Sequence, residues 1–424
     1  MYVLLLLLGC PSPSDVECAE GGTGTLHVVI DLPDETWEVA PELEVYDAAG
    51  AWVGTVTEPD ATLEVLGGGY TLVARRGTVA GAVVGTAHGL LDDTVQQVCV
   101  TDGGTTEWSG TWELQPASGK LWVTSGEDAS GFDPAALAAG GDAPAELGFH
   151  VDLSNDLRGF TVDPTGNLWV ATSPTYGARL LVYPPSGAAG GAEPIELGEA
   201  LFADNVQIQD ILFDEKDQLW VLVAGSNRGT VGLWSFAPEV GWAALTTGEL
   251  PDRPSQQLTV TGLVRAEDMT MGPDDRLWLA DFDGNQVLSV GVGHGVDEDP
   301  VEVAPDRVIT VAWDDETGSH TLESPTALAF DPDGRLWVNY WLSATLARFD
   351  TTDGGVRVPD LQAGTRPLDL LSGLAPDRAG AVWYGNDTGS GGEIVALDGD
   401  AGTEGSRARA GELPAIDLVF DPAP

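Results

Sequence analysis

The chain has 424 residues, and 43% of them are hydrophobic, so it can form one large or two medium domains with a sizeable core. Its 67 acidic and 18 basic residues give a formal net charge of −49. This imbalance argues against a nucleic-acid partner and against electrostatic docking on anionic lipid, since both require a basic surface. Two interpretations of the acids stay open: a solubilising surface, or carboxylates clustered around Ca²⁺.

The N-terminal stretch "MYVLLLLLGCPSPSDVEC" contains an apolar run from Tyr2 to Leu8. The run is too short for a membrane-spanning helix and lies at the lower limit for the apolar region of a signal peptide. Leu7-Leu8-Gly9-Cys10 resembles a bacterial lipobox, although no Lys or Arg precedes the run. The resemblance implies a bacterial lipoprotein with a signal peptide over residues 1–9, a lipidated Cys10 and a tether over residues 10–17. The expected location is the cell envelope, at the outer membrane or cell surface; a secreted and a cytosolic protein are the alternatives.

The three cysteines fit this interpretation. If Cys10 carries lipid, Cys18 and Cys99 remain as an even pair. We predict a Cys18–Cys99 disulfide, which suits an oxidising compartment. Two buried free thiols are the alternative.

Residues 18–115 have the pattern of a small antiparallel β-sandwich. Strand-like runs such as "GTLHVVIDL" and "LEVYDAAGAWVGTV" are separated by turn signals every 8–12 residues. The pattern "LEVLGGGYTLVA" followed by "VCVTDGGTTEW" resembles the carboxypeptidase-regulatory-like and PEGA-like sandwiches of exported bacterial proteins. No residue of this domain indicates catalysis.

The remainder repeats one unit: a strand, a turn rich in Asp, Pro and Gly, and a Leu-Trp-Val strand. Examples are "GFTVDPTGNLWVAT" and "ALAFDPDGRLWVNY". Each unit has room for four short strands, as in a β-propeller blade. The structural role explains the repeat best: the tryptophans pack between blades, and Asp, Pro and Gly form the turn. The period follows from six tryptophans spaced 46 to 59 residues apart: Trp122, Trp169, Trp220, Trp278, Trp337 and Trp383.

Six such strands predict an all-β protein with a six-bladed propeller over residues 118–424. The C-terminal "LPAIDLVFDPAP" resembles a blade-opening strand with no Leu-Trp-Val strand after it, whereas "SGKLWVTSG" at Ser118 has no clear opening strand before it. We therefore expect the C-terminal strand to pair with Lys120–Ser125 and close the ring without an exposed edge. In the alternative, "TWELQPASG" supplies that strand and the C-terminal strand is extra.

The motifs "DPDGRLWV" and "LADFDGNQVLSV" resemble those of NHL, SMP-30/gluconolactonase-like and streptogramin-lyase-like propellers. The gluconolactonase-like resemblance implies a divalent metal over the channel, held by Glu, Asn and Asp just before the first strand of a blade. Asp210, Asp268 and Asp417 share one position in three units, and Glu267 precedes Asp268. These four are the candidate ligands for one Ca²⁺ or another divalent cation, and solvated acids at strand starts are the alternative.

The lyase resemblance implies a histidine at the start of a blade. Pro325-Thr326-Ala327 stands at the comparable place, and His150, His294 and His320 all lie elsewhere. A lyase mechanism therefore has no obvious general base.

Polar and aromatic residues at the ends of the second strands indicate a ligand-binding face. Two aromatic residues after a core tryptophan, beside Asn and Asp, suit a peptide or a glycan. The alternative for Tyr340 and Trp341 is that they fill the gap to a neighbouring blade. The candidate ligand-binding residues are Arg158, Asp281 with Phe282, Asn339, Tyr340, Trp341, Asn386 and Asp387.

These features predict a lipid-anchored envelope protein whose propeller is a non-catalytic binding or scaffolding module for an envelope protein, peptide or glycan. The alternative is a metal-dependent, lactonase-like hydrolase acting on lactones or esters at the channel mouth.

Overall fold

A computed structural model gives the fold, and the chain divides into two compact units, Met1–Pro116 and Ala117–Pro424. Residues 1–17, including Cys10, lie outside the described part. No helix within that part is long and apolar enough to cross a membrane. The structure describes Cys18 and residues 21–31, 38–48, 52–80, 85–89, 95–116, 120–125, 128–139, 141–142, 147–150, 157–163, 167–172, 178–183, 193–198, 201–202, 206–214, 218–225, 231–237, 248–251, 253–292, 297–315, 318–331, 333–351, 354–363, 371–377, 381–387, 392–398, 404–411 and 417–421.

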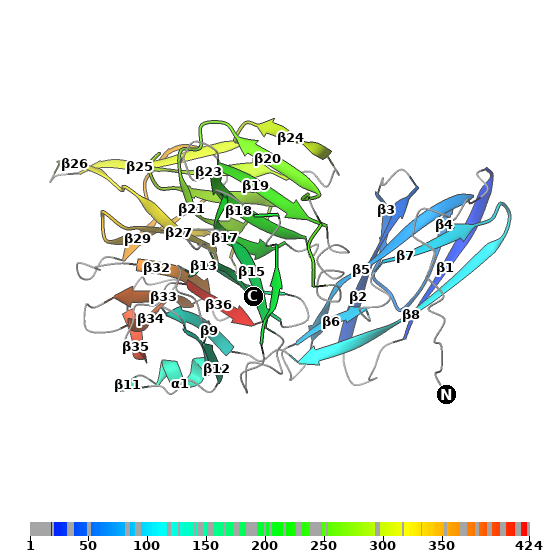
Figure 1. The fold of residues 1–424 in the computed structure, drawn as a ribbon, viewed down its shortest axis with the longest axis horizontal. Coiled ribbons are helices and arrows are strands. Elements are labelled where there is room, and N and C mark those ends of the chain that lie inside the picture. Colours follow the sequence, from blue (N-terminus) through cyan, green and yellow to red (C-terminus); the bar gives the residue numbers. More distant parts are fainter. Residues whose placement is uncertain are drawn as a thin grey trace, which may run out of the picture. The chain divides into compact units, whose positions relative to one another are not determined.

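The first unit consists of strands (Figure 1). β1 pairs with β4 and β8, while β2 pairs with β3 and β5, and β7 also pairs with β5. Both groups contribute side chains to one core that includes Leu26, Val45 and Trp108. The strands are β1 (Thr23–Asp31), β2 (Glu38–Asp47), β3 (Trp52–Val56), β4 (Asp60–Leu66), β5 (Gly68–Ala80), β6 (Gly85–Gly89), β7 (Val95–Val100) and β8 (Thr105–Pro116).

One pairing differs from the expected antiparallel arrangement. β1 and β8 run parallel, from Thr25 opposite Thr105 to Asp31 opposite Thr111. A parallel pair needs a long connection, and the six strands between β1 and β8 supply it.

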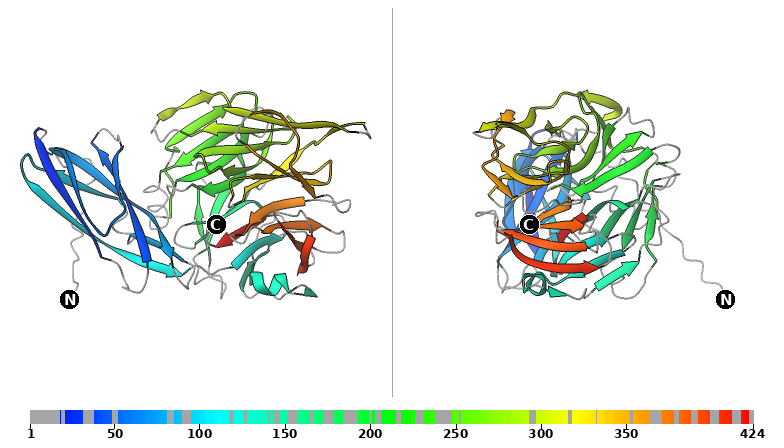
Figure 2. Two further views of the ribbon diagram at one scale, coloured as in Figure 1. Left: turned by 180° about the vertical axis from the view of Figure 1, so that it is seen from behind. Right: turned by 90° about the vertical axis from the view of Figure 1, so that its left-hand side faces the viewer.

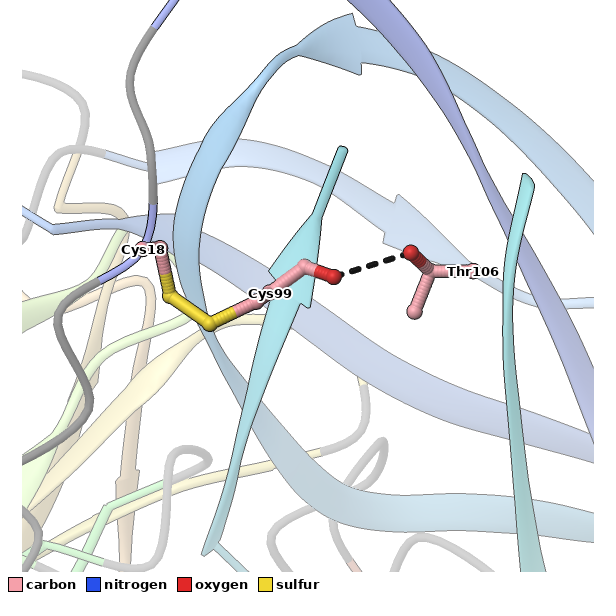
Figure 3. Close-up of a disulfide and its surroundings, with 3 residues drawn as sticks. All are labelled: Cys18, Cys99 and Thr106. Atoms are coloured by element: carbon pink, nitrogen blue, oxygen red, sulfur yellow. Dashed lines mark hydrogen bonds between the residues drawn. A yellow bond between two sulfur atoms is a disulfide. The ribbon is translucent and has the colours of Figure 1, made fainter. Parts of the chain in front are cut away.

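The predicted Cys18–Cys99 disulfide is confirmed (Figure 3). The two Cα atoms lie 5.5 Å apart across 81 residues of sequence. The Thr106 hydroxyl donates to the carbonyl oxygen of Cys99 at 2.9 Å, which connects the bridge to β8. On the chain-entropy model, a closed loop of this length destabilises the unfolded chain by about 4.5 kcal/mol.

The second unit is the predicted six-bladed propeller, seen from other sides in Figure 2. Blade 1 consists of β36 (Asp417–Asp421), β9 (Lys120–Ser125), β10 (Asp128–Phe132) and β12 (Leu147–His150), with the short α1 (Pro134–Ala138) and β11 (Gly141–Asp142) after β10. Blade 2 consists of β13 (Leu157–Val162), β14 (Leu168–Thr172), β15 (Arg179–Tyr183) and β16 (Ile195–Leu197). Blade 3 consists of β17 (Val206–Phe213), β18 (Leu219–Gly225), β19 (Val231–Phe236) and β20 (Gln256–Val260).

The next three blades follow in chain order. Blade 4 consists of β21 (Ala266–Met271), β22 (Arg276–Asp281), β23 (Gln286–Gly291) and β25 (Arg307–Asp315), with β24 (Asp297–Val303) and β26 (Gly318–Thr321) as additions. Blade 5 consists of β27 (Pro325–Phe330), β28 (Leu336–Tyr340), β29 (Thr345–Phe349) and β31 (Leu361–Ala363), with β30 (Gly355–Arg357) before β31. Blade 6 consists of β32 (Leu371–Pro376), β33 (Ala381–Asp387), β34 (Gly392–Asp398) and β35 (Glu404–Gly411).

The C-terminal strand closes the ring, as predicted. β36 pairs antiparallel with β9, from Asp417 opposite Thr124 to Asp421 opposite Lys120. The innermost strands β36, β13, β17, β21, β27 and β32 contact one another in that order, and β32 contacts β36 again. Blade 1 therefore combines the two ends of the unit, and its inner strand is not left as an open edge.

Three blades are also joined at the outside, which the sequence did not predict. In each case the chain leaves the third strand of a blade, pairs parallel with an outer strand of the preceding blade, and then returns. β11 of blade 1 pairs with β35, β24 of blade 4 with β20, and β30 of blade 5 with β25. We call these segments rim straps, because they hydrogen-bond neighbouring blades far from the channel.

Each repeat tryptophan packs against the following blade, as expected. Trp169 of blade 2, for example, shares a core with Ile211 and Val221 of blade 3, and Trp383 of blade 6 shares one with Leu121 and Leu418 of blade 1. The repeat thus builds six interfaces between blades around the channel.

The turn aspartate of the repeat is part of this interface. Asp214 accepts hydrogen bonds from Trp220 Nε1 and from the backbone N of Gln218, both at 2.9 Å. The same pair of bonds recurs at Asp163, Asp331 and Asp377. The repeated Asp therefore fixes both the turn and the orientation of the tryptophan six residues later.

Candidate functional site

The first strand of several blades is irregular where it begins, at the end that carries the candidate acids. Register shifts leave one extra residue on the first strand in blades 3, 4 and 5: Gln209, Glu267 and Thr326. A bulge of this kind bends the strand and re-aims the adjacent side chains. Asp210 and Asp268 directly follow the bulged residues, so their direction is set by backbone geometry that strand alternation alone does not predict.

The two aspartates connect consecutive blades. Asp210 accepts from its neighbour Ile211 N at 2.8 Å and from Met269 N of blade 4 at 2.9 Å. Asp268 accepts from Met269 N at 2.8 Å and from Leu328 N of blade 5 at 2.5 Å. All four carboxylate oxygens thus accept backbone N–H groups, and each aspartate joins the first strand of its own blade to that of the next.

Blade 2 has a glycine at the corresponding position. A Cβ added at Gly159 would lie 2.5 Å from Ile211 N and 2.7 Å from the Asp210 Cα. Blades 2 and 3 therefore make direct backbone contact where blades 3, 4 and 5 are connected through carboxylates.

The Asp268 carboxyl group has an unusual acidity. Its pKa is raised from 3.8 to about 6, mainly by burial and to a smaller extent by the charge of Glu267. The hydrogen bonds with Asp210, Leu328 N and Met269 N act in the opposite direction. Part of Asp268 remains accessible to solvent, but the strands around its carboxyl group make the charged form costly.

The fit of these acids to a metal ion is poor. Where side chains are described, no group of three or more His, Cys, Asp or Glu residues is placed to hold one. Glu267 forms an ion pair with Arg265. Asp417 lies in β36 opposite Thr124, and its side chain is outside the described part. The four-residue metal site stays a prediction. In the structure, the carboxylate oxygens of Asp210 and Asp268 accept hydrogen bonds from backbone N–H groups.

Much of the predicted ligand-binding face is buried, which corrects that prediction. Asn339 is fully buried and donates to the Thr326 hydroxyl at 2.8 Å. Tyr340 is 1% exposed and packs in the core between blades 4 and 5, so the structural alternative for this residue is correct. Burial also raises the pKa of Tyr340 far above its ordinary value. A ligand cannot reach these two side chains, because β28 is buried on both of its faces, with neighbouring blades on either side.

Asp281 is also buried and organises two loops. It accepts from Arg265 N at 2.8 Å and from Gln286 Nε2 at 2.7 Å, with longer bonds from Val264 N and Gly284 N. It therefore holds the loop before β21 against the turn after β22. We conclude that Asp281 positions a surface and does not itself contact a ligand.

For three other residues of the predicted ligand-binding face, the structure gives the position in the strand but no ligand-related contact among the described residues. Arg158 lies at the bulge of β13 and is partly exposed. Asn386 and Asp387 lie in β33, opposite Glu393 and Gly392, and their side chains are outside the described part. Their place on a ligand-binding face stays a prediction.

A partly exposed cluster of aromatic and charged side chains lies near the start of β21 and the ends of β22 and β28, in blades 4 and 5. The rings of Phe282 and Trp341 are 5.8 Å apart between centroids and tilted by 34°. The Arg265 guanidinium lies 4.8 Å from the centroid of Phe282, pairs with Glu267, and has Asp283 at 3.9 Å. We call these five residues the blade 4–5 patch.

Hydrogen bonds between loops fix the patch. Trp341 N donates to the carbonyl oxygen of Ser324, and Ser324 N donates to Asn285 Oδ1, both at 2.9 Å. Asn285, Ser324 and Ala344 have positive φ angles of 52°, 60° and 46°. Strained backbone of this kind persists only where surrounding contacts hold it, and it is common at binding sites.

The sequence pointed to Phe282, Trp341 and Glu267 of the patch but missed Arg265 and Asp283. Arg265 precedes a strand by one residue and follows no motif. Its only sequence signal is that it is one of 18 basic residues in a strongly acidic chain.

Comparisons with known proteins show similarity of shape only. No family model matches the chain, and no curated protein matches it. A protein of unknown function from Bacteroides caccae is 11% identical with a TM-score of 0.46, over 71% of this chain and 98% of that chain. A virginiamycin B lyase from Staphylococcus aureus is 13% identical with a TM-score of 0.36, over 63% and 78%. A luciferin-regenerating enzyme is 11% identical with a TM-score of 0.40, over 65% and 79%. At these values the likenesses carry no information about activity.

Proposed function

We propose that this chain is a lipid-anchored protein of the cell envelope whose propeller binds a partner without chemical conversion, through the blade 4–5 patch. The observation that carries the proposal is the partly exposed pair of aromatic rings, Phe282 and Trp341, held in place by hydrogen bonds between loops. Aromatic rings at a rigid surface contribute much contact area at low conformational cost. A surface held in this way suits recognition.

The state of the channel aspartates supports a non-catalytic role. Asp210 and Asp268 each use both oxygens to accept backbone N–H groups of two blades. Removing either group from this arrangement would expose unpaired donors, which is costly at an interface between blades. Their carboxylates are therefore explained without substrate or metal.

The test of this function uses peptide and glycan arrays probed with the full-length protein and with a Phe282→Ala/Trp341→Ala variant. We expect binding to one ligand class that the variant loses, while its melting temperature changes little because both rings are partly exposed. Binding that the variant retains in full, or binding to neither array, contradicts the proposal.

Membrane anchoring is tested separately at Cys10. A Cys10→Ala variant should move from the membrane fraction to the soluble fraction, since a lipid anchor requires the thiol. Retention of the variant in the membrane would rule out anchoring through this residue.

A divalent-metal-dependent, lactonase-like hydrolase is the second candidate, and the raised pKa of Asp268 beside Glu267 favours it. A carboxyl group that titrates near pH 6 can exchange protons near neutrality. Metal content by mass spectrometry, compared with an Asp268→Asn/Asp417→Asn variant, decides this candidate. About one divalent ion per wild-type chain, lost from the variant, would make the hydrolase the leading function; equal metal-free spectra would reject it.

A further inference from the structure

The blade 4–5 patch already holds a cation that belongs to the protein itself. The Arg265 guanidinium lies over the face of Phe282 at 4.8 Å and pairs with the Glu267 carboxylate. The side chain of Arg265 is nonetheless 36% exposed, and that of Asp283 is 43% exposed. Arg265 is therefore a surface occupant of the patch and not a buried structural group.

The surroundings of this guanidinium have the composition of a cation-binding site. An aromatic face attracts a cation through its quadrupole, and carboxylates neutralise the positive charge of that cation. Phe282 and Trp341 supply the aromatic surface, while Glu267 and Asp283 supply the negative charge. Phe282 and Asp283 lie in the turn after β22, Trp341 follows β28, and Glu267 is the bulged residue of β21.

One polar atom of each amide side chain at the turn after β22 has an internal partner, which leaves fewer groups to bind a glycan. Gln286 Nε2 donates to Asp281 and to the carbonyl oxygen of Gly262, and Asn285 Oδ1 accepts from Ser324 N. A sugar is held in place by such groups through its hydroxyls. The two described amide side chains of this turn thus have internal partners.

Apolar residues flank the patch on both loops. Val264 is 50% exposed beside Arg265, and Leu342 is 61% exposed beside Trp341. A partner that brings apolar groups together with a positive charge would cover these residues and meet a chain whose net charge is −49. A basic peptide segment has both properties.

We propose that Arg265 occupies a cation site from which a basic, partly apolar peptide segment of a partner protein displaces it. This inference rests on the proposed binding function and names its ligand class. The incoming Arg or Lys takes the place over Phe282 between the two carboxylates, and neighbouring apolar residues of the peptide cover Val264 and Leu342. Arg265 keeps the site closed against solvent while no partner is bound.

The experiment measures fluorescence anisotropy of a labelled hexapeptide of alternating Leu and Arg, titrated with the full-length protein. Arg265→Gln removes the competing cation and should strengthen binding about 3- to 10-fold. The matched control is Arg276→Gln, because Arg276 pairs with Asp274 and Asp306 at the opposite end of β22 and changes the net charge equally. This control should change the affinity less than about 2-fold.

Removal of the carboxylates has the opposite effect. Glu267→Gln/Asp283→Asn should weaken peptide binding about 10-fold or more, and Phe282→Ala should weaken it about 3- to 30-fold, as expected for a lost cation–π contact. Asp306→Asn/Asp333→Asn is the charge-matched control and should have little effect. Melting curves of all variants confirm that each is folded.

Equal effects of the two arginine variants, or of the two acidic double variants, would show unspecific attraction to an acidic protein and overturn the proposal. Absence of peptide binding overturns it as well. If an oligosaccharide such as chitohexaose binds in place of the peptide and Trp341→Ala abolishes that binding, the cation site is wrong while the recognition function stands. Failure of both probes and of the arrays would remove the recognition function itself.

Discussion

The turn aspartate of the propeller repeat gives the sharpest prediction about stability. In blade 3, Asp214 is 6% exposed and accepts from Trp220 Nε1 and Gln218 N, both at 2.9 Å. Asp214→Ala leaves both donors without their acceptor. A buried donor that loses its partner costs about 1–3 kcal/mol. Trp220 is fully buried, whereas Gln218 is closer to solvent, so we expect a loss of about 2–4 kcal/mol.

The assay is urea unfolding of the full-length protein, followed by the tryptophan fluorescence that reports mainly on the propeller. A second variant, Trp220→Phe in the Asp214→Ala background, removes the orphaned indole N–H and separates its cost from that of the lost turn. Asp333→Ala is the control, since this carboxylate is 71% exposed. A loss below about 0.5 kcal/mol for Asp214→Ala, or a loss equal to that of the control, would refute the reasoning.

Three further predictions concern other parts of the chain. Because the folded pKa of Asp268 is about 6 and its ordinary value is 3.8, the folded state holds a proton between these values that the unfolded state releases. This group therefore makes stability fall as pH rises from about 4 to 6, by up to about 3 kcal/mol, and unfolding at several pH values should show a flatter profile for Asp268→Asn. Gly159→Ala should destabilise the propeller by about 1–3 kcal/mol in urea unfolding, because the added methyl meets Ile211 N at 2.5 Å; an unchanged midpoint contradicts this close contact. Reduction of the Cys18–Cys99 disulfide should lower the melting temperature of the first unit and leave that of the propeller unchanged. A shift of both transitions together would contradict this prediction.

The propeller could be predicted well from the sequence because its interfaces repeat. One tryptophan in each unit, with an aspartate six residues earlier in four of them, encodes a blade interface directly. Blade 4 shows the consequence of a departure from this pattern. Gly272 replaces the aspartate there, and Trp278 Nε1 is buried without a hydrogen-bond partner among the described residues. A repeat thus predicts each blade to the extent that the blade keeps the pattern.

The candidate site could be predicted only in part, since its geometry depends on features without a sequence period. An acid at the start of a strand suggests, from the sequence, a solvated or metal-binding group. The bulge before Asp268 instead turns its carboxylate toward the next blade. At the end of β28, Tyr340 points into the core while Trp341, one residue later, reaches the surface. The rim straps show the same limit, because short parallel pairings such as that of β30 with β25 leave no clear pattern in the sequence.

The central claim, recognition through the blade 4–5 patch, is tested most directly by photo-crosslinking in intact cells. The photoreactive amino acid p-benzoylphenylalanine replaces Leu342, which is 61% exposed beside the patch, or Val358, which is 63% exposed on the connection before β31. We predict a discrete crosslinked product from position 342 that is absent at position 358 and is lost when Trp341→Ala is added. No product at position 342, or the same products from both positions, would contradict the claim.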